Sequence, residues 1–220
     1  MKAWLKIELK TESLFGSGRS VPGEVDQEVL HDEYGFPFYR AKAVKGHLRE
    51  QAEFVARALG NTGRKQELED IVRKCFGTGS LDQVLSGVVR LTDAQVRSSI
   101  REPFRQAVLS GEITAHDVLN ALTTVRFFTA IDDVTGSVEP ETLRQFRMVR
   151  PPLELEAHVD GLDSLTEHEI GLLAAAAASL RYIGTMKHRG KGEVRCRLMI
   201  ENVDKTYHYI EQLKKWVTTA

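Results

Sequence analysis

The order of alternating and helical segments limits the folds that this chain can adopt. Four segments alternate apolar and polar residues with the period of a half-buried strand: residues 3–9, 87–97, 153–159 and 193–202. The main helical segments are 43–59, which Gly60 ends, and the Ala-rich segment 166–182, which opens with a capping box between Thr166 and Glu169. The order strand, helix, strand, strand, helix, strand predicts an α+β protein with a ferredoxin-like (RRM-like) core.

A large insertion interrupts this order. Residues 98–150 contain two short helical stretches, FRQAVLSG and AHDVLNALT, and two extended segments, VRFFTAID and LRQFRMVR, around a predicted turn, DDVTGS. We predict one domain over residues 1–220, with a core at about 1–97 and 151–203, the insertion at about 98–150, and a C-terminal helix at about 204–220. A further helix is expected at 65–75. An insertion of this size is more than a simple domain needs, so we expect it to contact a partner.

Charge is balanced overall but uneven along the chain. Lys and Arg number 30 against 31 Asp and Glu, and the pI is about 6.7, whereas a generic basic nucleic-acid binder lies above about pI 9. Any RNA or DNA site must therefore be a local patch. Two segments fit such a patch: YRAKAVKGHLR (39–49), which has no acidic residue, and GTMKHRGKGEVR (184–195), where glycines alternate with basic residues. The first could bind phosphate or be a solvated helix face. For the second, the clustering of basic residues favours a phosphate-binding loop over a solvated turn.

Several classes of function are disfavoured. Cys75 and Cys196 have no CxxC or HxxH companion, which argues against a zinc site and a disulfide scaffold. No Walker loop, HExxH helix or Ser–His–Asp arrangement is apparent. The N-terminus does not resemble a signal peptide, and the longest apolar run is far shorter than the roughly 20 residues of a membrane span. We expect a cytoplasmic protein without a membrane partner.

Six sequence motifs occur together in a definite order. They are LFGSG in the first loop, GFPFY leading to VKGHLR, then FGTG, VRLTDA and TAIDDVTG, and finally GTMKHRGKGEV. This series resembles the RAMP superfamily (repeat-associated mysterious proteins) of CRISPR systems, and within it the backbone subunit of type III effector complexes. The resemblance covers the chain from Leu5 to about Ile200.

The resemblance implies that copies of the chain stack along a CRISPR guide RNA, together with other subunits, and pair it with a complementary target RNA. A thumb-like hairpin at residues 128–150 would wedge into the guide–target duplex. The residues expected to contact RNA are Arg19, Lys42, Lys45, Arg49, Arg144, Arg147, Met148, Lys187, Arg189, Gly190, Lys191 and Gly192.

The resemblance also implies a nuclease. Counting back from the YGFP turn places Asp26 where the family has its cutting aspartate, as a ligand of Mg²⁺ or another divalent cation, with His31 and Asp32 as minor helpers. Phe15 stands in the first loop where many members have a histidine, so no general acid is carried over from that loop. Three alternatives remain: a RAMP subunit that holds RNA without cutting, a metal-independent endonuclease that processes CRISPR RNA through His31 or His188, and an RNA-binding module unrelated to CRISPR.

Overall fold

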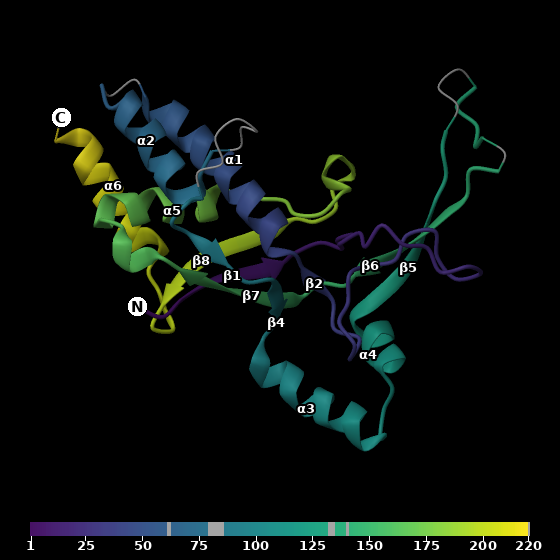
Figure 1. Ribbon diagram of the computed structural model, residues 1–220. Coiled ribbons are helices and arrows are strands. Elements are labelled where there is room, and N and C mark those ends of the chain that lie inside the picture. The colour runs from purple at the N-terminus through teal and green to yellow at the C-terminus, as the bar shows by residue number, and fades with distance from the viewer. Residues whose placement is uncertain (61–62, 79–85, 132–134, 140, 220) are drawn as a thin grey trace.

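An antiparallel sheet forms the centre of the protein (Figure 1). The computed structural model describes residues 1–60, 63–78, 86–131, 135–139 and 141–219. Within this part of the chain the sheet has seven strands in the order β2, β4, β7, β1, β8, β9, and β3 also pairs with β7. The strands are β1 (Ala3–Leu9), β2 (Phe38–Tyr39), β3 (Arg90–Leu91), β4 (Ala94–Val96), β7 (Leu153–Asp160), β8 (Val194–Ile200) and β9 (Val203–Asp204).

Helices pack on the face of the sheet that carries the apolar residues of each strand. Ala3, Leu5 and Ile7 of β1 are buried, while the residues between them are only partly buried. The helices are α1 (Ala41–Leu59), α2 (Lys65–Phe76), α5 (Glu167–Ser179) and α6 (Thr206–Thr218). The order β1, α1, β3/β4, β7, α5, β8, with β1 between β7 and β8, is a ferredoxin-like arrangement. The predicted α+β fold class is confirmed.

The predicted strand 87–97 is broken by a β-bulge. Arg90 pairs with Asp160, but Gln95 pairs with Glu156, so one extra residue lies on this strand between the two pairs. Burial therefore moves from Val89 to Ala94 and Val96, and Asp93 does not continue the buried face of Val89 as a regular alternation over residues 87–97 would require. Asp93 turns aside instead, and its Oδ1 accepts the Ala41 N–H at 2.7 Å. The bulge thus provides an acceptor for the first turn of α1.

The long helices agree with the sequence except near their ends. The capping box of Thr166 and Glu169 is present, but α5 ends at Ser179 rather than at residue 182. The chain becomes extended there because the Arg181 carbonyl accepts the Val194 N–H and Tyr182 pairs with Glu193. The C-terminal helix α6 packs closely on α5: a Cβ on Gly171 would lie 2.5 Å from the Tyr209 carbonyl oxygen. Among the described helices, none is long and apolar enough to cross a membrane.

The insertion forms an arm and a hairpin. The arm consists of α3 (Ser98–Ser110) and α4 (Ala115–Leu122), and α3 begins earlier than the predicted stretch FRQAVLSG. The hairpin consists of β5 (Thr123–Phe128) and β6 (Arg144–Val149), and it projects away from α1, α2, α5 and α6 (Figure 1). The predicted turn DDVTGS lies partly at 132–134, outside the described residues. The assignment of residues 1–220 to one domain stays a prediction.

Candidate nucleic-acid interface

The Gly-rich loop between α5 and β8 presents basic side chains on a fixed base. Its apex is a 3-10 turn, η3 (Lys187–Arg189), whose side chains are exposed. At the base, Gly184 has a φ of 86°, and a Cβ there would lie 2.6 Å from Ser13 Oγ. The Gly192 N–H donates to the Glu12 carbonyl at 2.7 Å. The loop is therefore held against the body at its base, while its apex, including Gly190, faces solvent.

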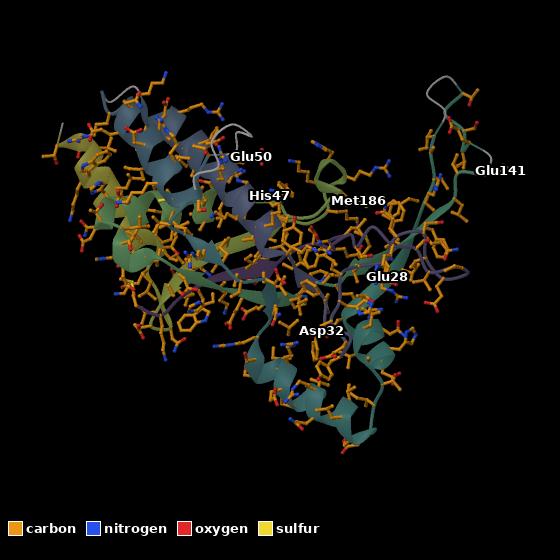
Figure 2. The ribbon with its side chains drawn as sticks, in the orientation of Figure 1. Glu28, Asp32, His47, Glu50, Glu141 and Met186 are labelled. Atoms are coloured by element: carbon orange, nitrogen blue, oxygen red, sulfur yellow. The ribbon has the colours of Figure 1, made fainter. Side chains whose placement is uncertain are left out.

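A cavity of about 450 Å³ lies between this loop and the hairpin. Phe128 and Phe146 form an aromatic pair on the hairpin side, with ring centroids 5.2 Å apart. The Arg189 guanidinium lies 5.9 Å from the Phe128 centroid. Met186 and His188 line the loop side, and Figure 2 shows Met186 between α1 and the hairpin. Aromatic rings beside cations suit unstacked bases and their phosphates.

Asp26 is attached to the strand that forms one wall of this cavity. Its N–H donates to the Gln145 carbonyl and its Oδ2 accepts the Gln145 N–H, both at 2.7 Å. Gln145 lies in β6 between Arg144 and Phe146, which both line the cavity. The Asp26 carboxylate is exposed, and its Oδ1 has no hydrogen-bond partner among the described residues. One carboxylate oxygen is thus available to a ligand.

The two expected helpers of Asp26 are engaged elsewhere. Asp32 forms an ion pair with Arg101 of α3, and its Oδ1 accepts the N–H groups of Tyr34 and Phe36. His31 lines a separate cavity of about 310 Å³ near α4, which Asp32 also lines. Asp32 shapes the YGFP turn and docks α3 through these contacts, and its role as a helper of Asp26 stays a prediction.

Two of the predicted thumb contacts are buried. Arg147 is 4% exposed and Met148 is fully buried. The Arg147 guanidinium forms an ion pair with Glu28, which is itself 6% exposed, and donates to Asn120 Oδ1 at 2.9 Å. Neither side chain has a surface to offer to RNA, so the prediction of direct contact is wrong for both. Arg147 joins β6 to α4 and to the acidic loop, residues 24–33, which contains five Asp and Glu residues.

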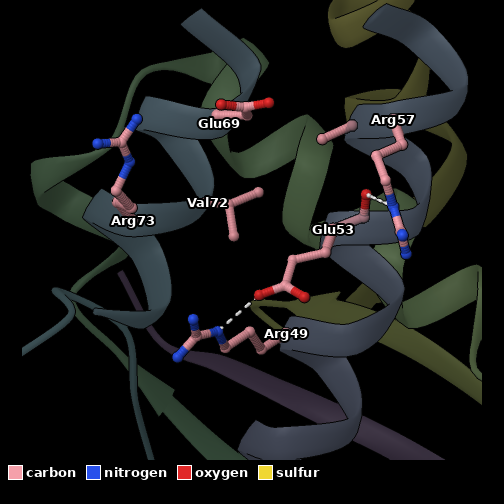
Figure 3. Close-up of a pocket in the computed structure, with 7 residues that line it drawn as sticks. Arg49, Glu53, Arg57, Glu69, Val72 and Arg73 are labelled. Carbon is pink, nitrogen blue, oxygen red and sulfur yellow. Dashed lines mark hydrogen bonds and ion pairs between the residues drawn. The ribbon is translucent and has the colours of Figure 1, made fainter. Parts of the chain in front are cut away.

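The predicted contacts on α1 are also partly engaged. Lys45 Nζ donates to the Val89 carbonyl at 2.8 Å, and burial lowers the pKa of this amine. Arg49 forms an ion pair with Glu53 at 2.8 Å, at the edge of a cavity of about 330 Å³ between α1 and α2 (Figure 3). Lys42, in the first turn of α1, is exposed and forms no ion pair among the described residues. It is the best placed of the three to contact a phosphate.

Glu12 links the loop to the hairpin. It accepts Lys191 of the Gly-rich loop at 2.9 Å and Arg126 of β5 at 2.6 Å. The hydrogen bond from Arg126 is the main cause that lowers the pKa of Glu12. Lys191 is therefore a clamp residue rather than a free cation. Within the described part of the chain, the predicted contacts that are exposed and have no carboxylate partner are Arg19, Lys42, Arg144, Lys187 and Arg189.

Comparison with known sequences decides the family. The family model of the RAMP superfamily matches residues 6–195, which is most of the chain. The chain belongs to the RAMP superfamily. No curated protein shows significant sequence similarity to this RAMP protein.

Solved structures share the fold of this RAMP protein. A chain in a cryo-EM structure of the Type III-B Cmr-beta bound to cognate target RNA superposes with a TM-score of 0.62 at 16% identity, covering 90% of this chain and 97% of that chain. A chain of the apo state of Type III-B Cmr-beta gives 0.63 at 16% identity, covering 92% and 99%. The fold shared with these two chains therefore covers about nine tenths of this chain.

Sequence reasoning missed two residues of this RAMP protein that lie under the loop. Tyr39, buried in β2, has its hydroxyl 3.0 Å from His47 Nε2 and accepts the Gly184 N–H at 3.2 Å. The sequence predicts no role for His47 beyond its place in the basic segment 39–49. Tyr39 lies in the same segment, but Gly184 is 145 residues away from Tyr39, so local spacing could not have shown that the two residues lie beneath the Gly-rich loop.

His47 should make stability depend on pH. Burial holds its pKa below the ordinary value, Glu50 opposes this shift, and Lys187 adds to it. The folded protein therefore binds this proton less readily than the unfolded chain, so stability falls as pH drops through about 6.5 and below. We expect the free energy of unfolding, measured with urea at pH 7.5 and 5.5, to fall less between these two pH values for His47→Gln than for the wild type. An equal fall in both proteins would contradict this. His168 stays as a second contributor in both proteins, because burial also lowers its pKa.

The residues near Asp26 offer little to a metal ion on their own. Among the described residues, no group of three or more His, Cys, Asp or Glu side chains could hold a metal. Mg²⁺ is often held by one or two carboxylates together with substrate phosphates and water. The free Oδ1 of Asp26 fits that pattern only if RNA supplies further oxygen ligands.

Proposed function

We propose that this RAMP protein is a backbone subunit of a type III CRISPR effector complex. The subunit would bind the phosphates of the guide RNA and cleave complementary target RNA with Asp26 as the catalytic residue. One observation carries the proposal. Arg144 and Arg189 line a cavity with aromatic walls, and Asp26 is hydrogen-bonded to the strand that supplies Arg144. Its partners would be guide RNA, target RNA, further copies of itself and other subunits, in the cytoplasm. A relative of the same fold is part of a Type III-B Cmr-beta assembly bound to cognate target RNA.

Binding would depend on cations that the fold leaves free. Arg189 on the loop and Arg144 on the hairpin line opposite walls of the cavity, and Lys187 lies exposed in the same turn as Arg189, so an RNA strand passing through the cavity would have its phosphates neutralised from both sides. Phe128 and Phe146 would offer ring faces to a base that has left its stack. None of these groups reads a base edge, so the binding would be largely independent of sequence.

Cleavage would depend on the exposed carboxylate of Asp26. The Gln145 N–H orients the side chain through Oδ2, which leaves Oδ1 to face the RNA backbone or to share a divalent cation with it. A cation such as Mg²⁺, when bound, would offset the charge that develops on the scissile phosphate. Asp26 could also take the proton of the neighbouring 2′-hydroxyl, the group that distinguishes RNA from DNA.

RNA binding should weaken when the exposed basic side chains of the Gly-rich loop are removed. We expect Lys187→Ala and Arg189→Ala each to reduce affinity for single-stranded RNA of any sequence and to lower the slope of log affinity against log salt by about 1. The matched control is Lys214→Ala, an exposed lysine on α6, which should change neither quantity. Fluorescence anisotropy over a salt series measures both. Equal affinity and slope in all four proteins would refute this binding surface.

A second function is favoured by the small number of candidate metal ligands around Asp26 in the part of the chain that the structure describes. Because no group of three candidate ligands occurs in the described residues, the subunit could hold guide RNA without cutting the target. A processing nuclease that relies on histidine stays an untested alternative. His188 and His31 line separate cavities, so they would have to act singly.

A further inference from the structure

The Tyr39 side chain contacts three other parts of the chain at the base of the Gly-rich loop. Tyr39 belongs to β2, and its ring packs against Phe15 of the first loop with centroids 4.9 Å apart. It also stacks against His47 of α1 at an interplanar angle of 10°. Its hydroxyl oxygen accepts the N–H of Gly184, the first glycine of the loop. Figure 2 shows His47 on α1, facing the loop that carries Met186.

The hydrogen bonds limit where the protons of the Tyr39–His47 pair can lie. The Gly184 N–H can only donate, so the Tyr39 oxygen accepts from it and the single Tyr39 proton is left to donate. His47 Nε2 lies 3.0 Å from the hydroxyl, and it accepts this proton in the neutral tautomer that carries its own proton on Nδ1. Burial agrees with this assignment because it disfavours charge on both groups, raising the pKa of Tyr39 and lowering that of His47.

We propose that Tyr39 and His47 are positioning residues for the RNA-binding loop, and that they set the orientation of Gly184 from which Lys187 and Arg189 project. The inference rests on the proposed RNA-binding function. Neither side chain needs to touch RNA: Tyr39 is 8% exposed. Their role is to restrict the loop before RNA arrives, so that less conformational freedom is lost on binding.

Other contacts hold different points of the loop. The Gly192 N–H donates to Glu12, the Ile183 carbonyl accepts Ser13 Oγ at 3.1 Å, and the Thr185 N–H makes a long bond of 3.4 Å to Leu14. Gly184 lies between these points, and Tyr39 is the acceptor of its N–H. Removal of the hydroxyl would leave the base of the loop attached but its ascending arm looser.

The test compares the full-length wild type with Tyr39→Phe, His47→Ala and His47→Gln. Phenylalanine keeps the ring and removes only the hydroxyl. Glutamine supplies a neutral acceptor for the Tyr39 proton, whereas alanine supplies none. RNA affinity is measured by anisotropy over a salt series, and exchange of the Gly184 amide proton is measured without RNA. Unfolding midpoints confirm that each variant is folded.

We expect Tyr39→Phe and His47→Ala to bind RNA about three- to tenfold more weakly, as for one lost hydrogen bond. The salt slope should stay that of the wild type, because the phosphate contacts remain, and His47→Gln should recover most of the affinity. Wild-type affinity in Tyr39→Phe and His47→Ala would overturn the inference, and so would a lower slope, which indicates lost phosphate contacts.

Failure of the proposed function would look different. If the wild type itself bound no RNA, RNA binding by this chain would be refuted, while amide exchange would still test the positioning role. Faster exchange at Gly184 in Tyr39→Phe supports that role. Unchanged exchange overturns it, whatever the RNA measurements show.

Discussion

Replacement of Asp26 by alanine is expected to reduce cleavage of guide-complementary RNA by the assembled complex about a hundredfold or more. The carboxylate is exposed, has a free Oδ1, and is joined to the hairpin strand that lines the candidate RNA cavity. Guide binding should remain, since the free cations of the loop and hairpin are untouched. Cleavage is measured on a labelled target with Mg²⁺ and with EDTA, which should abolish it in the wild type.

Asp26→Asn separates the charge of the side chain from its structural role. Asparagine keeps an oxygen that can accept the Gln145 N–H, so the loop should stay on β6, but it removes the negative charge. If the carboxylate acts on the RNA or on a cation, this variant should lose cleavage as alanine does. Cleavage at the wild-type rate in both variants would sink the catalytic proposal, and the chain would then only hold RNA. Activity that persists in EDTA would refute the requirement for a metal ion but leave Asp26 as a candidate catalytic residue.

Replacement of Arg147 by alanine is expected to destabilise the fold by about 3–5 kcal/mol, the range for breaking a buried ion pair. Arg147 donates Nε to Glu28 Oε2 at 3.0 Å and NH2 to Glu24 Oε2 at 3.2 Å. Without the guanidinium, Glu28 would be a buried carboxylate that keeps only the Val29 N–H as a partner among the described residues. Urea unfolding at neutral pH measures the loss.

Arg144→Ala is the matched control for that experiment. It lies in the same strand, but its side chain is exposed and forms no ion pair in the described part of the chain. It should change stability by less than about 0.5 kcal/mol while weakening RNA binding. Similar stability losses in both variants would contradict the assignment of Arg147 to the interior and Arg144 to the interface.

The core of the fold could be predicted because its information is local. Alternation in 3–9 and 153–159 fixes which side chains of β1 and β7 face the helices, and the Thr166 capping box marks the start of α5. The errors arise where a distant partner decides the outcome. The bulge near Asp93 depends on the start of α1, and the end of α5 depends on pairing with β8.

The candidate site was harder to predict because ion pairing is not local. Lys191 and Glu12 form an ion pair although they lie near opposite ends of the chain, and Lys45 bonds to the carbonyl of Val89. Sequence can count basic residues, but it cannot show which ones the fold has already neutralised. Arg147 was misjudged for a related reason: the acidic loop packs against the end of β6 and buries residues that a two-stranded hairpin would expose.

The bonds between the acidic loop and β6 make one mechanical unit of the hairpin and the carboxylate. Besides the two bonds between Asp26 and Gln145, the Arg147 N–H donates to the Gln27 carbonyl at 3.0 Å. Any movement of the hairpin would therefore move Asp26 by the same rigid-body motion. If the hairpin separates the strands of an RNA duplex, the distance along the RNA from the separated base pair to the cleavage site is set within a single chain. Each copy in an assembly would keep this distance, whatever the spacing between neighbouring copies.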